Sequence, residues 1–309
     1  MSYFQNNLQI KNEHCFQNVC LLKNGKIAAL GWGTLIIFNE KSFKIENNFY
    51  FGEHILQRGF SQLSDSNIII WGHSVVIYKI KDNSFTLLYK LKIIANKVIE
   101  AKNKKLISVT QEDKTLKIWE FQKSKKNYIC IDTIVHGLSI QMNIEFIKEN
   151  EFIFMTENVI RFYEVKKNNI NKISHLDIKN NKCFLKKNNL GFLMSNGKIN
   201  VIDLNKRKLL YIYKPKDPID ILSTCYLTNG NIIIVGFIDK EKYSSNYYRL
   251  EILEFKENKF KQIYKQDIFG GNYPNGVPVI EDMLLLKKNM KENLMIINNY
   301  NIFIYEKIS

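Results

Sequence analysis

Apolar residues recur along this chain in short, strand-like stretches that share one layout. Seven stretches align on an anchor residue, and the residues one and three positions before each anchor are apolar in all seven. The residue two positions before the anchor is apolar in some repeats and polar or charged in others. Because side chains alternate between the two faces of a strand, the pattern predicts seven strands that each bury at least one face. The anchors are Phe38, Tyr78, Trp119, Tyr163, Ile202, Leu253 and Tyr305.

Each of these predicted strands belongs to a longer repeat. Two apolar runs joined by a polar turn precede it, as in LLKNGKIAAL (21–30) and YLTNGNIII (226–234), and this arrangement is a hairpin signal. Six of the repeats continue into a further apolar run, for example NSFTLLYKL (83–91). The seventh ends at Ser309, and SYFQNNLQI (2–10) at the other end of the chain is the segment that can supply its missing strand.

Four short strands per repeat, at the spacing of ~40–45 residues that is typical of propeller blades, predict an all-β fold. We expect a single seven-bladed β-propeller of four-stranded antiparallel blades, closed by the N-terminal strand. No segment shows the 3.6-residue apolar period of a helix. The blades are expected at about 14–50, 55–93, 97–135, 140–178, 182–214, 219–268 and 277–309, with the N-terminal strand at 2–10.

One repeat carries a family resemblance. The stretch LISVTQEDKTLKIWEF (106–121) resembles the core of a WD repeat, with Trp119 at the end of a strand and Asp113 six residues before it. The resemblance implies a WD-repeat propeller. It also implies an incomplete Asp-His-Ser-Trp hydrogen-bond network in this repeat, because the Gly-His pair of the family is missing. His54 and His136 are the nearest candidates for that histidine.

The remaining composition argues against several classes of protein. The five cysteines (Cys15, Cys20, Cys130, Cys183 and Cys225) form no CxxC pair, which favours small buried residues in a reducing compartment. No apolar run approaches the ~18 residues that span a bilayer, and no signal peptide is evident. These features predict a cytoplasmic protein, with the nucleus as the other compartment.

Motifs for catalysis or for metal binding are missing from the sequence. The five histidines are scattered without an HExxH spacing, and the Gly-Trp-Gly of residues 31–33 joins two predicted strands, so it reads as a tight turn and not as a phosphate-binding loop. We therefore expect no enzymatic activity, no catalytic residues, no metal and no cofactor.

The net charge of +15 is partly compositional, because only four of the 45 basic residues are arginines. Its placement is more informative. Residues 161–216 hold fourteen basic and three acidic residues, and many of the basic ones fall in turns between the first and second or the third and fourth strands of a blade. Both kinds of turn emerge on one face of a propeller. We expect a basic docking face on blades 3–5 for an acidic partner, although a merely solvated lysine-rich surface is the other reading. Its candidate residues are Lys166, Lys167, Lys186, Lys187, Lys206, Arg207 and Lys208.

A second candidate surface lies on the opposite face. The predicted loops 237–250 and 269–278 are rich in Tyr and Asn, and tyrosine can anchor a partner at a small entropic cost. The candidate anchors are Tyr243, Tyr247, Tyr248 and Tyr273.

Taken together, the sequence predicts a non-catalytic interaction scaffold that binds proteins within a multi-subunit complex, with RNA or an acidic protein on its basic face. One alternative is a phosphoinositide- or membrane-binding propeller, for which LQRGF (56–60) is the only approximation to the expected Phe-Arg-Arg-Gly loop. The other alternative is a propeller-fold enzyme, which would need acid and base groups that converge at the channel mouth.

Overall fold

The computed structural model describes most of the chain. It describes residues 4–11, 16–51, 57–81, 84–110, 112–137, 143–179, 181–195, 197–215, 219–227, 229–238, 247–257, 259–269, 280–288, 291–298 and 301–307. No helix in this part of the chain is long and apolar enough to cross a membrane.

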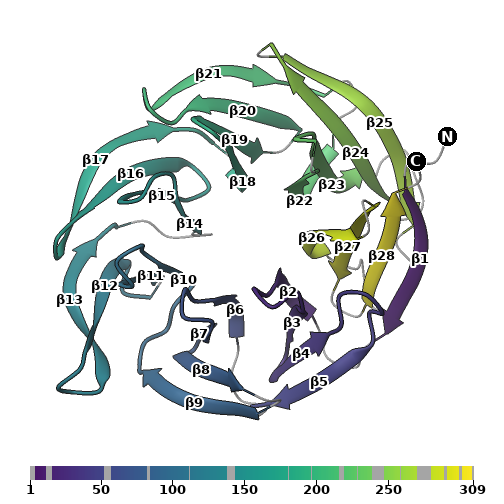
Figure 1. The fold of residues 1–309 in the computed structure, drawn as a ribbon. Coiled ribbons are helices and arrows are strands. Elements are labelled where there is room, and N and C mark those ends of the chain that lie inside the picture. Colours follow the sequence, from purple (N-terminus) through teal and green to yellow (C-terminus); the bar gives the residue numbers. More distant parts are fainter. Residues whose placement is uncertain are drawn as a thin grey trace.

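The described strands form seven four-stranded antiparallel sheets, which Figure 1 shows arranged as blades around a central axis. The prediction of an all-β propeller with four-stranded antiparallel blades is confirmed. Blade 1 consists of β2 (Phe16–Leu21), β3 (Ile27–Gly31), β4 (Thr34–Phe38) and β5 (Ile45–Tyr50); blade 2 of β6 (Gln57–Gln62), β7 (Ile68–Gly72), β8 (Val75–Lys81) and β9 (Ser84–Leu91); blade 3 of β10 (Lys97–Glu100), β11 (Leu106–Val109), β12 (Thr115–Gln122) and β13 (Asn127–Val135); blade 4 of β14 (Asn143–Phe146), β15 (Glu151–Met155), β16 (Val159–Lys166) and β17 (Asn169–Asp177); blade 5 of β18 (Asn181–Lys187), β19 (Leu190–Ser195), β20 (Lys198–Asp203) and β21 (Lys208–Tyr213); blade 6 of β22 (Ile219–Tyr226), β23 (Ile232–Ile238), β24 (Tyr247–Lys256) and β25 (Lys259–Phe269); and blade 7 of β26 (Ile280–Lys288), β27 (Lys291–Asn298), β28 (Asn301–Lys307) and β1 (Phe4–Lys11).

The N-terminal strand completes blade 7. Strand β1 pairs antiparallel with β28, from Phe4 opposite Lys307 to Lys11 opposite Asn301, and the two strands lie side by side at the right of Figure 1. The sequence predicted this strand at 2–10, and the observed strand begins two residues later and ends one residue later. The first and last strands of the chain thus belong to one sheet.

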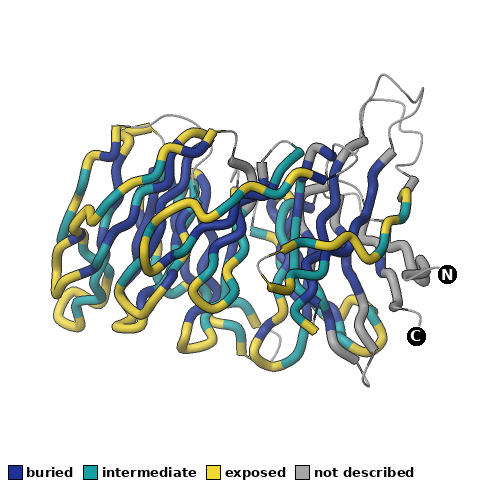
Figure 2. The backbone as a smooth tube through the Cα atoms, turned by 90° about the horizontal axis from the view of Figure 1, so that it is seen from above, coloured by how far each residue is buried: buried dark blue, intermediate teal, exposed yellow. Residues whose placement is uncertain are grey.

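The core consists of apolar clusters at the seams between neighbouring blades. Phe152, Phe154 and Tyr163 of blade 4 pack with Leu116 and Ile118 of blade 3, and six further clusters fill the other seams. Both faces of the second and third strands are consequently buried, as along all of β4. Figure 2 shows these strands in dark blue, while the turns and the outer strands are exposed.

The anchor residues identified in the sequence mark an irregularity that every blade shares. At each anchor the pairing between the third and fourth strands shifts, and the fourth strand gains one extra residue; in blade 3 this residue is Ile131, opposite Ile118 and Trp119. The same shift occurs in the other six blades. Such a β-bulge bends a strand and increases its twist, and it also makes the outer edge a poorer template for aggregation.

Candidate docking face

The turns of the antiparallel blades divide the molecule into two faces. Turns between the first and second strands and between the third and fourth strands lie at one end of the ring, which we call the turn face. The turns between the second and third strands lie at the other end, together with the connections between blades, and we call this end the opposite face. Figure 2 shows the exposed turns at both ends.

Neighbouring blades are linked across the turn face by lysine side chains. Lys105, in the first turn of blade 3, is 7% exposed. Its Nζ donates to the Lys167 carbonyl at 2.8 Å and to Asn168 Oδ1 at 2.6 Å, both in the last turn of blade 4, and it pairs with Glu120 at 3.2 Å. A buried ammonium with three acceptors holds two turns together, so this lysine is a structural link.

Two of the predicted docking lysines form the same kind of link. Lys186 of blade 5 donates to the Ile147 carbonyl of blade 4, and Lys187 donates to the Gly230 carbonyl of blade 6 at 3.1 Å. A Cβ added to Gly230 would lie 2.7 Å from Lys187 Nζ, so the lysine side chain would have to shift if a larger residue stood there. Carbonyl acceptors carry no net charge, and both ammonium groups therefore still contribute positive potential to the turn face.

Two other predicted residues are paired with carboxylates. Arg207 of blade 5 contacts Glu151 of blade 4 at 3.1 Å, and Lys166 contacts Glu164 at 3.2 Å. The basic turns contain no acid of their own, but the neighbouring blade and the preceding strand supply one to each of these side chains. Arg207 and Lys166 therefore contribute little to the field of the face.

Three further predicted residues, Lys167 in blade 4 and Lys206 and Lys208 in blade 5, are exposed, and their side chains take no part in the contacts described above. Asp203, the residue after the anchor Ile202, shapes the turn that presents two of them, because its Oδ1 accepts from the amides of Asn205 and Lys206, both at 2.9 Å. The Lys186 and Arg207 contacts place the turns of blades 4 and 5 next to each other. These contacts reach the first turn of blade 4, whereas Lys166 and Lys167 lie in its last turn. That the seven residues form one docking patch stays a prediction.

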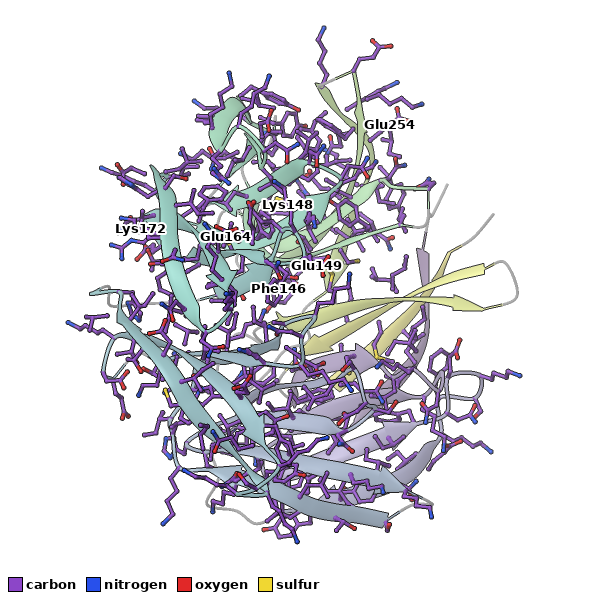
Figure 3. All side chains as sticks on the ribbon, turned by 60° about the vertical axis from the view of Figure 1, so that its left-hand side comes forward. Phe146, Lys148, Glu149, Glu164, Lys172 and Glu254 are labelled. Atoms are coloured by element: carbon purple, nitrogen blue, oxygen red, sulfur yellow. The ribbon has the colours of Figure 1, made fainter. Side chains whose placement is uncertain are left out.

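Blade 4 also shows how the charge varies across its strands. In Figure 3, Lys172 lies on the outer strand β17, whereas Lys148 and Glu149 lie nearer the inside of the ring. Lys148 pairs with Glu151 at 3.4 Å, and Glu149 pairs with Lys102 of blade 3 at 3.0 Å. The inner part of this turn face is therefore a mixture of charges, and the excess of positive charge lies toward the third and fourth strands.

The tyrosine cluster predicted for the opposite face is wrong for Tyr248. This side chain is 3% exposed and packs with Leu250, Met283 and Leu294 in the seam between blades 6 and 7. The physical reason is that β24 begins at Tyr247, so Tyr248 lies in a strand opposite Phe237 and Ile268. Tyr247 lies at the start of that strand. Tyr243 and Tyr273 lie outside the described residues.

Blade 3 contains part of the hydrogen-bond network that the WD-repeat resemblance implied. Trp119 Nε1 donates to Ser108 Oγ at 2.9 Å, and Asp113 accepts from Thr115 Oγ1 at 2.6 Å and from Thr110 Oγ1. Burial alone would raise the pKa of Asp113, but the hydrogen bonds from Lys117 and Thr115 outweigh it and lower this pKa. Asp113 thereby acts as an ionised acceptor that fastens the turn between β11 and β12.

His136 lies close to this network, and its ring contacts a backbone carbonyl. Its Nε2 is 3.1 Å from the Thr110 carbonyl, while its own carbonyl accepts from Arg161 at 2.6 Å. The side chain is 3% exposed, and burial lowers its pKa, with the nearby Arg161 adding to the effect. His136 therefore stabilises the connection between blades 3 and 4 as a neutral ring.

Sequence reasoning missed the links between blades. Lys105 and Lys23 are such links, and Lys23 Nζ donates to the carbonyls of Leu63 and Ser64 in blade 2 at 2.9 and 2.6 Å. No local signal distinguishes these lysines from solvated ones, because their acceptors lie about 40 to 60 residues further along the chain. Among the described residues, no group of His, Cys, Asp and Glu side chains could hold a metal ion.

Comparison of the sequence with models of protein families yields no match, and comparison with curated proteins yields none either. The fold is that of a β-propeller, and the WD-repeat resemblance of blade 3 stays a prediction.

Proposed function

We propose that this chain is a seven-bladed, WD-repeat-like propeller that serves as a non-catalytic scaffold in a ribonucleoprotein assembly, with the turn face of blades 4 and 5 docking onto RNA. One observation carries the proposal. Lys167, Lys206 and Lys208 are exposed at the last turns of two adjacent blades, and the ammonium groups of Lys186 and Lys187 in blade 5 contact neutral carbonyls. A row of cations of this kind matches a phosphate backbone.

A non-catalytic role is supported by where two tyrosines with raised pKa values lie. Burial raises the pKa of Tyr128 and of Tyr211 to about 12, and these two rings lie in different seams, between blades 2 and 3 and between blades 5 and 6. A catalytic centre would bring such groups together in one site. These tyrosines instead belong to the packing between blades.

The membrane-binding alternative is less well supported. Arg58, the one arginine of LQRGF, lies within the inner strand β6 and not in an extended loop. An anionic membrane would thus have to bind through the same lysines as RNA, so a binding experiment can separate the two partners directly.

The test measures binding of a fluorescent single-stranded poly(U) RNA at several salt concentrations. The variant K167E/K206E/K208E replaces three exposed lysines whose side chains do not link neighbouring blades. It should reduce the slope of log K against log salt by about 2, because each phosphate contact on a single strand contributes about 0.7. The matched control K92E/K114E/K179E changes three exposed lysines on the opposite face and should reduce the slope much less.

Equal losses in the two variants would mean that binding follows net charge, and the docking face would then be rejected. Polyglutamate that binds more tightly than RNA at equal charge would indicate an acidic protein as the partner. Vesicles containing phosphoinositides that outcompete RNA would favour the membrane alternative.

A further inference from the structure

Trp32 is unusually exposed for a tryptophan. It lies at the tip of the turn between β3 and β4, on the opposite face, and 57% of its surface is exposed. The other two tryptophans of the chain, Trp71 and Trp119, are buried and half-buried. Tyr50, the last residue of β5, pairs with Thr34 beside the same turn and is 59% exposed. Blade 1 therefore presents two large aromatic side chains at one end.

The turn that carries Trp32 is held by several hydrogen bonds. The Gly33 amide donates to Gln57 Oε1 at 3.1 Å, and the Gly33 carbonyl accepts from the Phe51 amide at 2.8 Å. Gln57 belongs to blade 2 and is 4% exposed. The tip of the turn is thus fixed to its own blade and to the next one, and a partner would not have to order it on binding.

The indole N–H of Trp32 already has an acceptor within the protein. With the Gln17 amide oriented so that both its ends are satisfied, Gln17 accepts from Trp32 Nε1 at 2.8 Å and donates to the Gln57 carbonyl at 2.6 Å. What Trp32 presents to solvent is therefore its apolar ring. Such a surface gains most from contact with an apolar side chain of a partner.

Among the described residues, the charge beside Trp32 is positive. Arg58 directly follows Gln57 and is exposed. Residues 31–35, 49–51, 57–59 and 71–75 are described parts of this end of blades 1 and 2, and they contain no acidic residue and no other Lys or Arg. The connection 52–56, which contains Glu53, lies outside the described residues. One guanidinium suits a carboxylate, whereas a nucleic-acid backbone needs several cations along its length.

We infer that Trp32, Tyr50 and Arg58 form a docking site for a short extended segment of a partner protein, in which an apolar side chain lies next to an acidic one. The apolar side chain packs on the ring of Trp32, and the carboxylate pairs with Arg58. This site is separate from the turn face, and its test does not depend on RNA binding.

The experiment selects binders from a random twelve-residue peptide display library on the full chain, with the variants W32A and R58E selected in parallel. The expected result is a consensus that combines a large apolar residue with Asp or Glu. A synthetic peptide of that consensus should bind W32A at least tenfold more weakly, and R58E should instead enrich peptides with Lys or Arg at the acidic position. The matched control L87A, which truncates a side chain that is 51% exposed on the outer strand β9, should bind like the unchanged protein.

The two variants keep the inference testable even if one of them folds poorly, because R58E leaves the Trp32 turn intact. The inference is overturned if no peptide is enriched, if the consensus lacks an acidic residue, or if W32A binds as tightly as the unchanged chain. It is also overturned if poly(U) RNA, and not the peptide, protects Trp32 fluorescence from quenching by acrylamide.

Discussion

Trp119 stabilises blade 3 through its ring and through its indole N–H. The ring is half-buried against the cluster between blades 2 and 3, and the N–H donates to Ser108 Oγ, which is fully buried. We expect W119A to lower the free energy of unfolding by about 3 kcal/mol and S108A by about 1 kcal/mol. Because the two residues share one bond, the double variant should lose less than the sum in urea denaturation. Strictly additive losses would show that the bond contributes nothing.

His136 makes the stability of the fold sensitive to mild acid. Burial lowers the pKa of its ring in the folded state, Arg161 and Lys114 lower it further, and the Thr110 carbonyl and Asp113 oppose them. The unfolded chain therefore binds a proton more readily than the folded chain as the pH falls below about 6.5. The contribution of the neutral ring is complete above that pH and is lost as the pH falls toward the folded-state pKa.

We therefore expect the unchanged protein to lose stability between pH 7.5 and pH 5.5 more steeply than the variant H136Q, by at most about 1.4 kcal/mol for each pH unit. Urea denaturation at a series of pH values gives the two slopes. Parallel slopes would mean that the histidine is protonated equally well in the folded chain.

Sequence reasoning at the scale of single residues succeeded where the signal was local. Trp119 and Asp113 follow from the strand and turn in which they lie, and both take part in the network of blade 3. The burial of Tyr248 could not be read from the same kind of signal, because the start of β24 depends on its pairing with β23. The environment of His136 depends on Thr110 and Arg161, which lie about 25 residues away in opposite directions.

At the scale of elements, the turns of the basic face serve structure as well as charge. The side chains of Lys186 and Lys187 connect blade 5 with blades 4 and 6, while those of Lys206 and Lys208 form no such link in the described part of the chain. We expect K186M and K187M each to lower the free energy of unfolding by about 1 kcal/mol, since each removes a charge-assisted hydrogen bond at a partly screened site.

The matched variants K206M and K208M should change the stability by less than about 0.5 kcal/mol, because surface substitutions that break no contact are nearly neutral. Thermal or urea unfolding of the four variants makes the comparison. If all four behave alike, the lysine links do not stabilise the seams.

The hairpins and their turns were predictable because apolar alternation and Asn-Gly signals are local. The bulge at each anchor was not predicted, although the anchor itself was found, because a bulge is a property of two paired strands. In blade 3 it appears only when Ile118 and Trp119 are aligned with Asp132 and Cys130. The links between turns belong to the same category, since they join blades that meet only in the folded ring.

At the scale of the whole molecule, stability depends on closing the ring. Each blade buries both faces of its inner strands against its neighbours, and the seam between blades 7 and 1 joins Leu286, Met295 and Ile304 to Phe16 and Phe38. Blade 7, which forms one side of this seam, is a sheet whose strands come from both ends of the chain. The outer strand of that sheet, β1, therefore joins the first and last parts of the sequence through non-covalent contacts.

Deleting residues 1–11 should remove strand β1 and leave the edge of β28 unpaired, from Asn301 to Lys307. We expect the free energy of unfolding to fall by several kcal/mol, because a ladder of backbone hydrogen bonds is lost and an exposed strand edge invites aggregation.

A synthetic peptide of residues 1–11 added to the truncated protein should bind at the unpaired edge of β28 and raise the melting temperature in a concentration-dependent way. A scrambled peptide of the same composition should not, since it cannot reproduce the register of Leu8 opposite Ile304 and Ile10 opposite Ile302. An unchanged melting temperature after truncation, or equal rescue by both peptides, would show that the ring does not depend on β1 for its closure.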